Sequence, residues 1–567
     1  MKSEDKGFQG GFRQSMAWLH TWTGLCVCWL LFAIFLTGTL SFYRDEINVW
    51  MKPELHGSQA DEQTAQRALD RMALLAPKAT NWSIGLPNER EPAVSVSWRE
   101  PGAAQGRAGA KRAMLDAGTG EVVEARETRG GDFLYRFHFE LYGFDRLAAR
   151  MLVGAATMIM LVGLVTGVVT HKKIFKDFFT FRPRKGQRSW LDAHNATAVL
   201  ALPFHLMITY SGLLLLMYSL MPWGMQAAYP DGRDGFFAEL RGGGRPAENA
   251  QANREGGGRE GGRGGRREAE QEVAVALTPI APLLAQASAR WGGMPVGNIN
   301  VERPGTARAV IELRALHGDS LVDRGAVDTM KFDGVTGAPL TPADPRTVSA
   351  TRGFYNSLSS LHMIHFAGPV LRMLFFVAGL IGTAMVATGA VLWVVKRAPE
   401  RLKLGHTPRG HRLVEMLNVA AIAGLPLAVG AYFWANRLIP ADMVTRSDWE
   451  IRSFFIVWAL TLVHAVLRPH ARAWIEQLLL AAALLVLAPV LNAATSDSHL
   501  FASLLAGRWS LVGVEVVQIA TGAGLGYIAW RVARFKPPQK ASRRSAASSS
   551  KAVESRSRLA TTAESAS

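Results

Sequence analysis

Apolar runs of membrane-spanning length recur along this chain and restrict what it can fold into. A helix needs about 20 consecutive apolar residues to cross a bilayer, and within the bilayer it must satisfy its own backbone hydrogen bonds. Eight runs approach that length, the sixth being the shortest: Thr23–Phe42, Met151–Thr170, Ala196–Met221, Val370–Val395, Leu413–Trp434, Phe454–Leu467, Trp474–Leu491 and Leu511–Trp530. We therefore predict an α-helical integral membrane protein with about eight spans.

The distribution of basic residues predicts the orientation of these spans. The chain has 63 Lys and Arg residues and a formal net charge of +17, and its basic segments flank the apolar runs at 171–190, at 396–412, at 468–472 and after Arg531. Basic loops stay in the cytoplasm, so we expect both termini to be cytoplasmic, and in a bacterial cell the opposite face is the periplasm or the cell exterior. No nucleic-acid-binding motif accompanies the charge, so we expect the lipid bilayer as a partner and no nucleic acid.

Two long inserts fall on the opposite, periplasmic face and resemble each other. Each contains an Asp-x-x-Thr-Gly stretch, beginning at Asp116 and at Asp333, which predicts a strand–turn–strand with glycine in the left-handed region. Each also has an earlier helix-like segment and a β-rich run: Thr64–Ala76 with Val94–Trp98, and Pro279–Arg290 with Ala309–Leu313. We therefore expect two small α+β domains in the periplasm.

These features divide the chain into seven regions. They are the first span with the N-terminus (1–42), the first periplasmic domain (43–147), spans two and three with their basic loop (148–221), the second periplasmic domain (222–369), span four (370–397), four further spans (398–534) and a polar, disordered tail (535–567). Residues 242–272 are rich in Gly, Arg and Glu and cannot bury a core, so we expect a disordered loop. An RNA-binding role for this tract is disfavoured because it faces away from the cytoplasm.

Histidines in two of the spans indicate an internal duplication. His20 precedes Gly38 by 18 residues and His194 precedes Gly212 by 18 residues, and each glycine follows a Thr or Ser. His205 lies 11 residues after His194, which places it on the same face of one continuous helix and about 16 Å along its axis. The twin position of His205 is Leu31, so His205 is either a ligand or an internal polar contact.

Sorted by depth, the histidines of the repeat form two layers. His20, His171 and His194 lie at the cytoplasmic ends of spans, whereas His138, His362 and His365 lie at the outer ends of spans two and four. Paired imidazoles from neighbouring helices are what a low-spin b-type haem requires, and small residues let a flat macrocycle approach a helix. We predict His20 with His194, and His138 with His362 or His365, as metal ligands, with His171 and His205 as further cofactor-binding candidates.

Other interpretations of these residues remain open. The histidines could be interfacial residues that only hydrogen-bond to loops or headgroups. We interpret the remaining seven as structural or solvated: His56, His317, His406, His411, His464, His470 and His499. The sequence has no HExxH, CxxC, nucleotide-binding GxGxxG or nucleophile-elbow motif, and Cys26 and Cys28 point apart on one helix, so no disulfide framework is expected.

Residues 12–398 resemble the PepSY-associated transmembrane helix family of bacterial inner-membrane proteins. The matching residues are Trp18-Leu-His20-x-Trp22-x-Gly24, Thr37-Gly38, the two Asp-x-x-Thr-Gly stretches, His138, Thr166-Gly167, His194, Leu361-His362 and Thr388-Gly389. This family includes iron-regulated proteins and haem-containing reductases of ferric siderophores. The resemblance implies PepSY-like periplasmic domains, two b haems, a cytoplasmic or quinol electron donor, and a ferric siderophore or other ferric chelate as acceptor.

The sequence departs from the family pattern in two places. Spans five to eight lie beyond the family core, and His171 replaces a more usual aromatic residue. Two other functions stay open: a non-redox scaffold whose PepSY-like domains bind or inhibit periplasmic proteins, and a transporter subunit. The transporter is disfavoured because the two halves are related in parallel, without an inverted repeat.

Overall fold

The computed structural model describes ten stretches of the chain: residues 11–104, 109–171, 182–183, 185–232, 235–236, 275–318, 321–322, 328–340, 350–364 and 366–535. The Gly/Arg-rich segment 242–272, His365 and the tail beyond residue 535 lie outside the described residues. Within the described stretches, eight helical segments are long and apolar enough to cross a membrane. The prediction of a multi-pass α-helical membrane protein is therefore confirmed.

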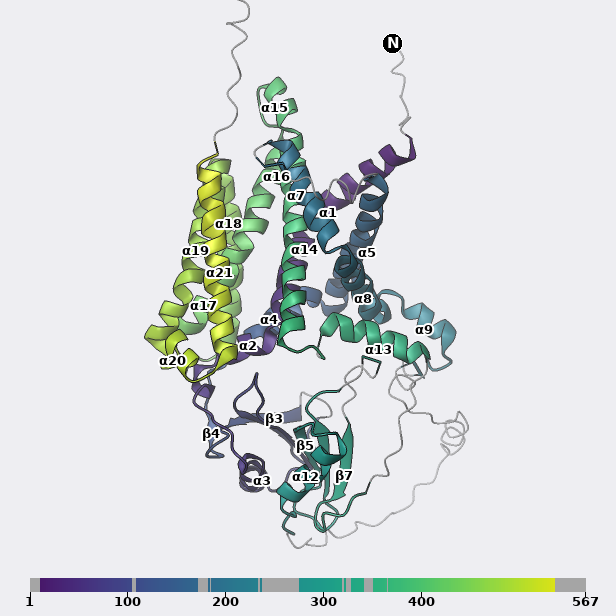
Figure 1. Cartoon of the computed structure of the whole chain (residues 1–567), viewed down its shortest axis with the longest axis vertical. Helices are drawn as coiled ribbons and strands as arrows, with labels where there is room; N and C mark the ends of the chain where they lie inside the picture. The colour runs from purple at the N-terminus through teal and green to yellow at the C-terminus, as the bar shows by residue number, and fades with distance from the viewer. Residues whose placement is uncertain are drawn as a thin grey trace, which may run out of the picture.

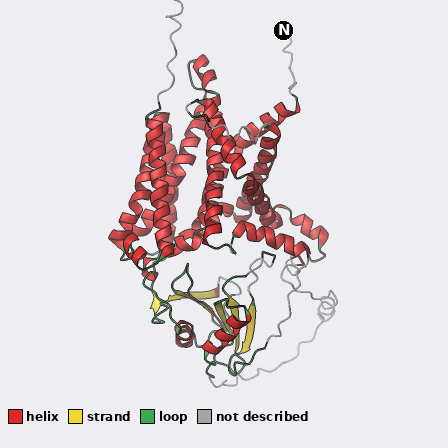
Figure 2. Cartoon of the chain, in the orientation of Figure 1, coloured by secondary structure: helices red, strands yellow, loops and turns green. Residues whose placement is uncertain are grey.

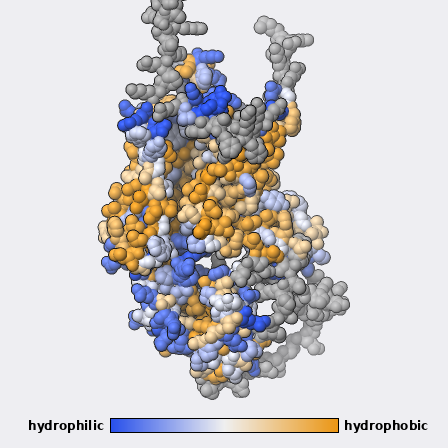
Figure 3. Space-filling view, viewed as in Figure 1, coloured by the Kyte–Doolittle hydropathy of each residue, from blue (hydrophilic) through white to orange (hydrophobic). Residues whose placement is uncertain are grey.

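The spans stand side by side, with a β-sheet at one end of them and both ends of the described chain at the other (Figure 1). We name these ends the sheet side and the far side. Apolar side chains cover the outside of the helices as a belt, and polar residues gather beyond the belt on both sides (Figure 3). This distribution matches a protein surrounded by lipid at its middle.

The first four spans form a ring of helices. Helix α1 (Phe12–Ser41) packs against α5 (Arg146–Thr170) and α14 (Pro369–Lys396), α5 packs against α8 (Leu202–Leu220), and α14 packs against α7 (Gln187–Leu200). Helix α1 and the α7–α8 pair therefore lie diagonally across the ring.

The third span is not the continuous helix that the sequence analysis predicted. The chain breaks at Ala201 between α7 and α8, and Pro203 lies in the first turn of α8, where its missing N–H is not required. His194 and His205 consequently lie on different helices. The expected alignment of these two histidines on one helix face is wrong.

His138 and His362 lie on short helices that precede the spans, and not on the spans themselves. Helix α4 (Gly130–Glu140) ends at Leu141, whose φ is 48°, and α5 begins afresh at Asp145, whose side chain accepts the N–H groups of Leu147 and Ala148. Helix α13 (Ala350–Met363) likewise ends before α14 and runs across the sheet-side end of α8 (Figure 1). Both short helices lie at the sheet side of the ring.

The remaining spans form a second bundle beside the first (Figure 2). This added bundle consists of α16 (Arg409–Asn418), a π-helical turn (Val419–Ala423), α17 (Gly424–Leu438), α18 (Arg446–Leu467), α19 (His470–Thr495), α20 (Leu500–Leu505) and α21 (Trp509–Ala533). Asn418 joins the two bundles: it accepts the indole N–H of Trp29 at 2.8 Å and donates to the carbonyl of Ala390 at 3.0 Å. The sixth span is 22 residues long, longer than the apolar run Phe454–Leu467, because its polar first turn is buried inside the protein.

The sequence analysis predicts two separate domains for the two inserts. In the structure the two inserts instead share one sheet. Its order is β4-β3-β2-β1-β5-β6-β7, and the first insert joins the second through the antiparallel pair of β1 and β5. The strands are β1 (Asn81–Gly85), β2 (Val94–Arg99), β3 (Ala110–Leu115), β4 (Val122–Val123), β5 (Val296–Glu302), β6 (Val310–Ala315) and β7 (Thr329–Asp333). Helices α3 (Thr64–Leu75) and α12 (Ile280–Arg290) contribute to one continuous core with the strands, which includes Trp82, Ile299 and Phe332.

The Asp-x-x-Thr-Gly stretches form matching turns in the two inserts. Asp116 accepts the N–H groups of Gly118 and Thr119, and Asp333 accepts those of Val335 and Thr336. Gly120 and Gly337 both have φ of 74°, a conformation that favours glycine. The predicted strand–turn–strand is confirmed at Asp116, between β3 and β4, whereas the turn at Asp333 follows β7 and leads only to an isolated bridge between Phe332 and Pro339.

Shorter helices connect these parts. They are α2 (Arg44–Trp50), the 3₁₀ turn Pro53–Leu55, α9 (Pro222–Ala228) and α15 (Ala398–Leu404). Helix α2 contacts both α4 and α21, so it lies between the ring and the added bundle at the sheet side.

Arg446 and Glu450 form an ion pair within the added bundle, and both side chains are fully buried. We predict that Arg446→Met lowers the free energy of unfolding by about 3–5 kcal/mol, because it leaves the Glu450 carboxylate buried without its cation. Thermal unfolding in detergent measures this. The control is Arg468→Met, which breaks a solvent-exposed pair with Glu476 and should leave the melting temperature close to that of the wild type. Equal melting temperatures for the two variants would contradict the prediction.

Candidate functional site

The structure brings four of the predicted histidines together as two pairs. On the far side, the rings of His20 (α1) and His194 (α7) have centroids 6.2 Å apart and an interplanar angle of 58°. On the sheet side, the rings of His138 (α4) and His362 (α13) have centroids 6.2 Å apart and an angle of 38°. We call these the far pair and the sheet-side pair.

Each of the four imidazoles is held at Nδ1 by a neighbouring helix. The contacts are His20 to the Gly163 carbonyl (2.9 Å), His194 to the Met385 carbonyl (2.9 Å), His138 to the Ile34 carbonyl (2.8 Å), and His362 to the Ser211 hydroxyl (2.9 Å) and the Ile208 carbonyl. Because a carbonyl only accepts, Nδ1 carries the proton. The Nε2 lone pair of each ring is then free to bind a metal.

The same backbone motif provides all four of these acceptors. Each carbonyl belongs to the residue three positions before a Ser or Thr, and the hydroxyl of that Ser or Thr donates back to the same turn of helix. The next residue is always glycine. We call each such turn an imidazole seat, and the four seats end in Thr37-Gly38, Thr166-Gly167, Ser211-Gly212 and Thr388-Gly389.

The glycines let the imidazole rings approach the helix backbone. A Cβ at Gly38 would lie 2.6 Å from Cε1 of His138, and a Cβ at Gly389 would lie 3.1 Å from Cε1 of His194. At Gly167 and Gly212 the distances to Cε1 of His20 and His362 would be 3.3 and 3.2 Å. The sequence analysis predicts that small residues let a macrocycle approach the helices. In the structure these glycines leave room for the imidazole rings of the histidines.

The separation of the rings fits two ligands on one metal ion. A metal–imidazole bond is about 2.0 Å long and a ring nitrogen lies about 1.1 Å from the ring centre, so two imidazoles on opposite sides of one ion have centroids about 6.2 Å apart. Both pairs show this distance. Within the described residues, no cluster of three or more His, Cys, Asp or Glu side chains could hold a metal. A metal at either pair would therefore take its other ligands from outside these side chains, and a porphyrin is one group that could supply them.

The sheet-side imidazoles are neutral at pH 7, as ligation requires. Burial lowers the pKa of His138, and burial together with His138 lowers the pKa of His362 to about 3. A neutral imidazole retains the lone pair that a metal ion binds.

A cavity of about 560 Å³ adjoins the sheet-side pair. His138, His362, Gly38 and Gly212 are among its lining residues. Its volume lies within the range of sites that hold cofactor-sized ligands. Four arginines also line it: Arg44, Arg90, Arg150 and Arg372.

The four arginines already have acidic partners. Arg90 and Arg372 both contact Glu46, at 2.8 and 3.1 Å, and Arg150 contacts Glu140 at 2.5 Å. Arg44 contacts Asp45 at 3.2 Å. Guanidinium groups bind carboxylates in a bidentate geometry, so an acidic ligand in the cavity would compete with these partners for the arginines. The sequence analysis missed these arginines because they come from four separate segments.

The other predicted residues join neither pair. His205 is buried, and its ring centroid lies 6.2 Å from that of Phe35. Among the described residues its ring nitrogens make no hydrogen bond of normal geometry, and their nearest acceptor is the Ala198 carbonyl. His171 contacts the side chain of Asn195 at 2.8 Å. His365, the predicted alternative to His362, lies outside the described residues.

Comparison with known proteins identifies the family of the chain. Residues 17–396 match the family described as the PepSY-associated TM region. The chain belongs to this family. The matched region contains all four paired histidines and all four imidazole seats, and the added bundle lies beyond it. A protein of Pseudomonas aeruginosa described as uncharacterized is 26% identical over 423 residues, which cover 72% of this chain and 96% of that protein.

The seat at Gly38 can be tested by substitution. We predict that Gly38→Ala displaces the His138 ring, because the new methyl group would overlap it, and lowers the haem content by about one per chain. Gly24→Ala on the same helix is the control, since a Cβ there meets nothing within 4 Å. Pyridine haemochrome analysis after haem-replete expression measures both variants. Full haem loading in Gly38→Ala would show that this seat is not needed for ligation.

Proposed function

We propose that this protein is a di-haem b oxidoreductase of the bacterial inner membrane that moves electrons across the bilayer to reduce periplasmic ferric iron. The observation that carries the proposal is the repeated geometry of the two imidazole pairs. Four histidines from four helices occupy four copies of one seat, and both pairs have a centroid distance of 6.2 Å. Histidines that only hydrogen-bond to headgroups would not need this repeated arrangement.

The residues that would hold the haems follow from the pairs. His20 and His194 would hold one haem on the far side, and His138 and His362 would hold the other on the sheet side. A haem iron between two imidazoles alternates between the ferric and ferrous states and so carries one electron. The Nδ1 hydrogen bonds fix each ring and raise its basicity as a ligand, and the apolar helices exclude water and ions from the path between the pairs.

The direction of transfer follows from the expected orientation. Basic residues such as Arg397, Lys403 and Arg409 lie at the far side, which supports a cytoplasmic location for that side and for both termini. Electrons would then enter at the far pair from a cytoplasmic or quinol donor. They would leave at the sheet-side pair in the periplasm.

The acceptor is a ferric chelate, for which a ferric siderophore is the leading candidate. Siderophores bind Fe(III) through hard oxygen donors, and reduction to Fe(II) weakens that binding and releases the metal. We infer that the shared sheet consists of two PepSY-like units. This sheet lies at the same end of the spans as α4 and α13, which carry His138 and His362, and so on the side from which a periplasmic chelate would approach (Figure 1).

Haem content of histidine variants tests this proposal. We predict that His20→Ala and His194→Ala each lose one haem per chain and keep the other spectrally intact, whereas His362→Ala loses only the other haem. Each of these variants should fail to reduce a periplasmic ferric chelate, because the two centres act in series. His406→Ala, at an exposed position, is the control and should retain both haems. Full haem loading in both His20→Ala and His194→Ala would refute the far pair.

The orientation has a separate test. We predict that tags placed after Gly186 and after Pro537 are protected in spheroplasts, and that a tag within residues 242–272 is accessible to protease, because the basic loops stay in the cytoplasm. Western blotting after protease treatment measures accessibility, and detergent-lysed cells show that each tag can be cleaved. Cleavage of the Gly186 tag in intact spheroplasts would overturn the topology.

A further inference from the structure

The helix that carries His138 is held by residues that lie outside the family-matched region. Helix α4 has only 11 residues, and an isolated helix of that length is marginally stable in water. Its position must therefore come from its neighbours. Three successive parts of the segment 126–137 contact helices α17 and α18 of the added bundle.

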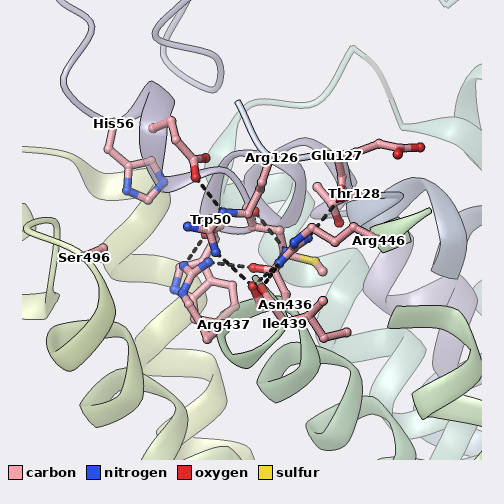
Figure 4. A network of polar contacts seen from close by, with 12 residues as sticks. Trp50, His56, Arg126, Glu127, Thr128, Asn436, Arg437, Ile439, Arg446 and Ser496 are labelled. Carbon is pink, nitrogen blue, oxygen red and sulfur yellow. Dashed lines mark hydrogen bonds and ion pairs between the residues drawn. The ribbon is translucent and has the colours of Figure 1, made fainter. Parts of the chain in front are cut away.

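The first part is the extended segment before α4, which a buried polar network holds (Figure 4). Arg126 donates to the carbonyl of Asn436 at 2.9 Å, and the Thr128 hydroxyl donates to Glu450 at 2.5 Å. The Glu127 carbonyl accepts a hydrogen bond from Arg446 at 3.0 Å. Asn436, Arg446 and Glu450 are fully buried, so these contacts are shielded from water.

The second part is the first turn of α4, which lies between α17 and α2. The Tyr432 hydroxyl, buried on α17, donates to the carbonyl of Gly130 at 2.9 Å. On the opposite side, a Cβ at Gly130 or Gly131 would overlap Asn48 or the Arg44 carbonyl of α2. The start of α4 is thus confined from two sides.

The third part is an aromatic face that ends beside His138. Phe133 and Phe137 are one turn apart on α4, and their rings lie 5.1 and 5.8 Å from Phe454. The rings of Phe455 and Trp458 lie 5.7 and 6.0 Å from Phe137. Because His138 directly follows Phe137, these contacts act together with the packing of α4 on α1 and the seat at Ile34 to set the rotation of α4 and the direction in which the imidazole points.

We propose that the added spans position His138, so that α17 and α18 set the imidazole geometry at the sheet-side pair. This inference rests on the proposed function, because the geometry acts on a bound haem. The orientation of a ligand and the hydrogen bond behind it tune the metal that it holds. The twin helix α13 packs along α8 within the family-matched region, so the added spans act on one ligand of the sheet-side pair.

Two matched substitutions on α17 test the proposal. Tyr432→Phe removes the hydrogen bond to Gly130 of α4, whereas Trp434→Phe removes a bond to the Leu484 carbonyl within the added bundle. In the haem-free protein, we expect hydrogen–deuterium exchange of residues 130–140 to be faster in Tyr432→Phe than in Trp434→Phe. In the haem-loaded protein, we expect Tyr432→Phe to shift the midpoint potential and the low-spin electron paramagnetic resonance signal of the sheet-side centre alone.

The outcomes separate this inference from the proposed function. Absence of haem in the wild type would refute the proposed function. The exchange measurement on the haem-free protein would still test whether α17 and α18 hold α4 in place. Unchanged exchange in Tyr432→Phe, or equal shifts at both centres, would overturn the positioning role. If Tyr432→Phe does not accumulate, Thr128→Val replaces it, and Thr128→Ser should restore the wild-type potential because it keeps the hydroxyl that contacts Glu450. A shift that Thr128→Ser does not reverse would also overturn the proposal.

Discussion

The arrangement of the ring of helices depends on one type of hydrogen bond, which occurs four times. In each, an imidazole Nδ1 donates to the carbonyl of a helical turn that ends in a Ser/Thr-Gly pair. In an apolar interior an unpaired N–H group is costly, and each of the four paired histidines has an acceptor at Nδ1. A helix carbonyl can accept a second bond because it has two lone pairs, and the glycine beside it leaves room for the ring. Used four times, this bond makes the rings of His20 and His194, and those of His138 and His362, face each other at the same distance.

The same hydrogen bond occurs in both halves of the internal duplication, so the two halves contribute equally to the histidine pairs. Each half of the ring supplies two seats and two histidines, and the β1–β5 pair joins the two halves again in the sheet. The added bundle has no counterpart in this repeat. It contacts α14 of the second half as well as α1, α2 and α4 of the first, and its contacts with α4 make the surroundings of His138 different from those of His362. Two centres with identical ligands can in this way acquire different properties, which an ordered transfer of electrons requires.

Sequence reasoning succeeded where the information is local. Apolar runs, the Asp-x-x-Thr-Gly turns and the equal spacing of His20 and His194 from their glycines predicted the spans, the turns and the far pair. It failed where tertiary contacts decide. Pro203 breaks a run that hydropathy alone predicts as continuous, Leu141 adopts a positive φ that separates α4 from α5, and the edges of the two inserts pair into one sheet. The arginines beside the cavity come from distant segments, so no local pattern could have identified them.

The central claim is that each imidazole pair binds one haem. The most direct test is the reduced-minus-oxidised visible spectrum of the purified wild-type protein, combined with the ratio of haem to protein after haem-replete expression. We expect two b haems per chain, with the sharp α and β bands of iron held by two imidazoles. A colourless protein, or a single high-spin haem, would contradict it, and the histidine pairs would then be structural contacts between helices.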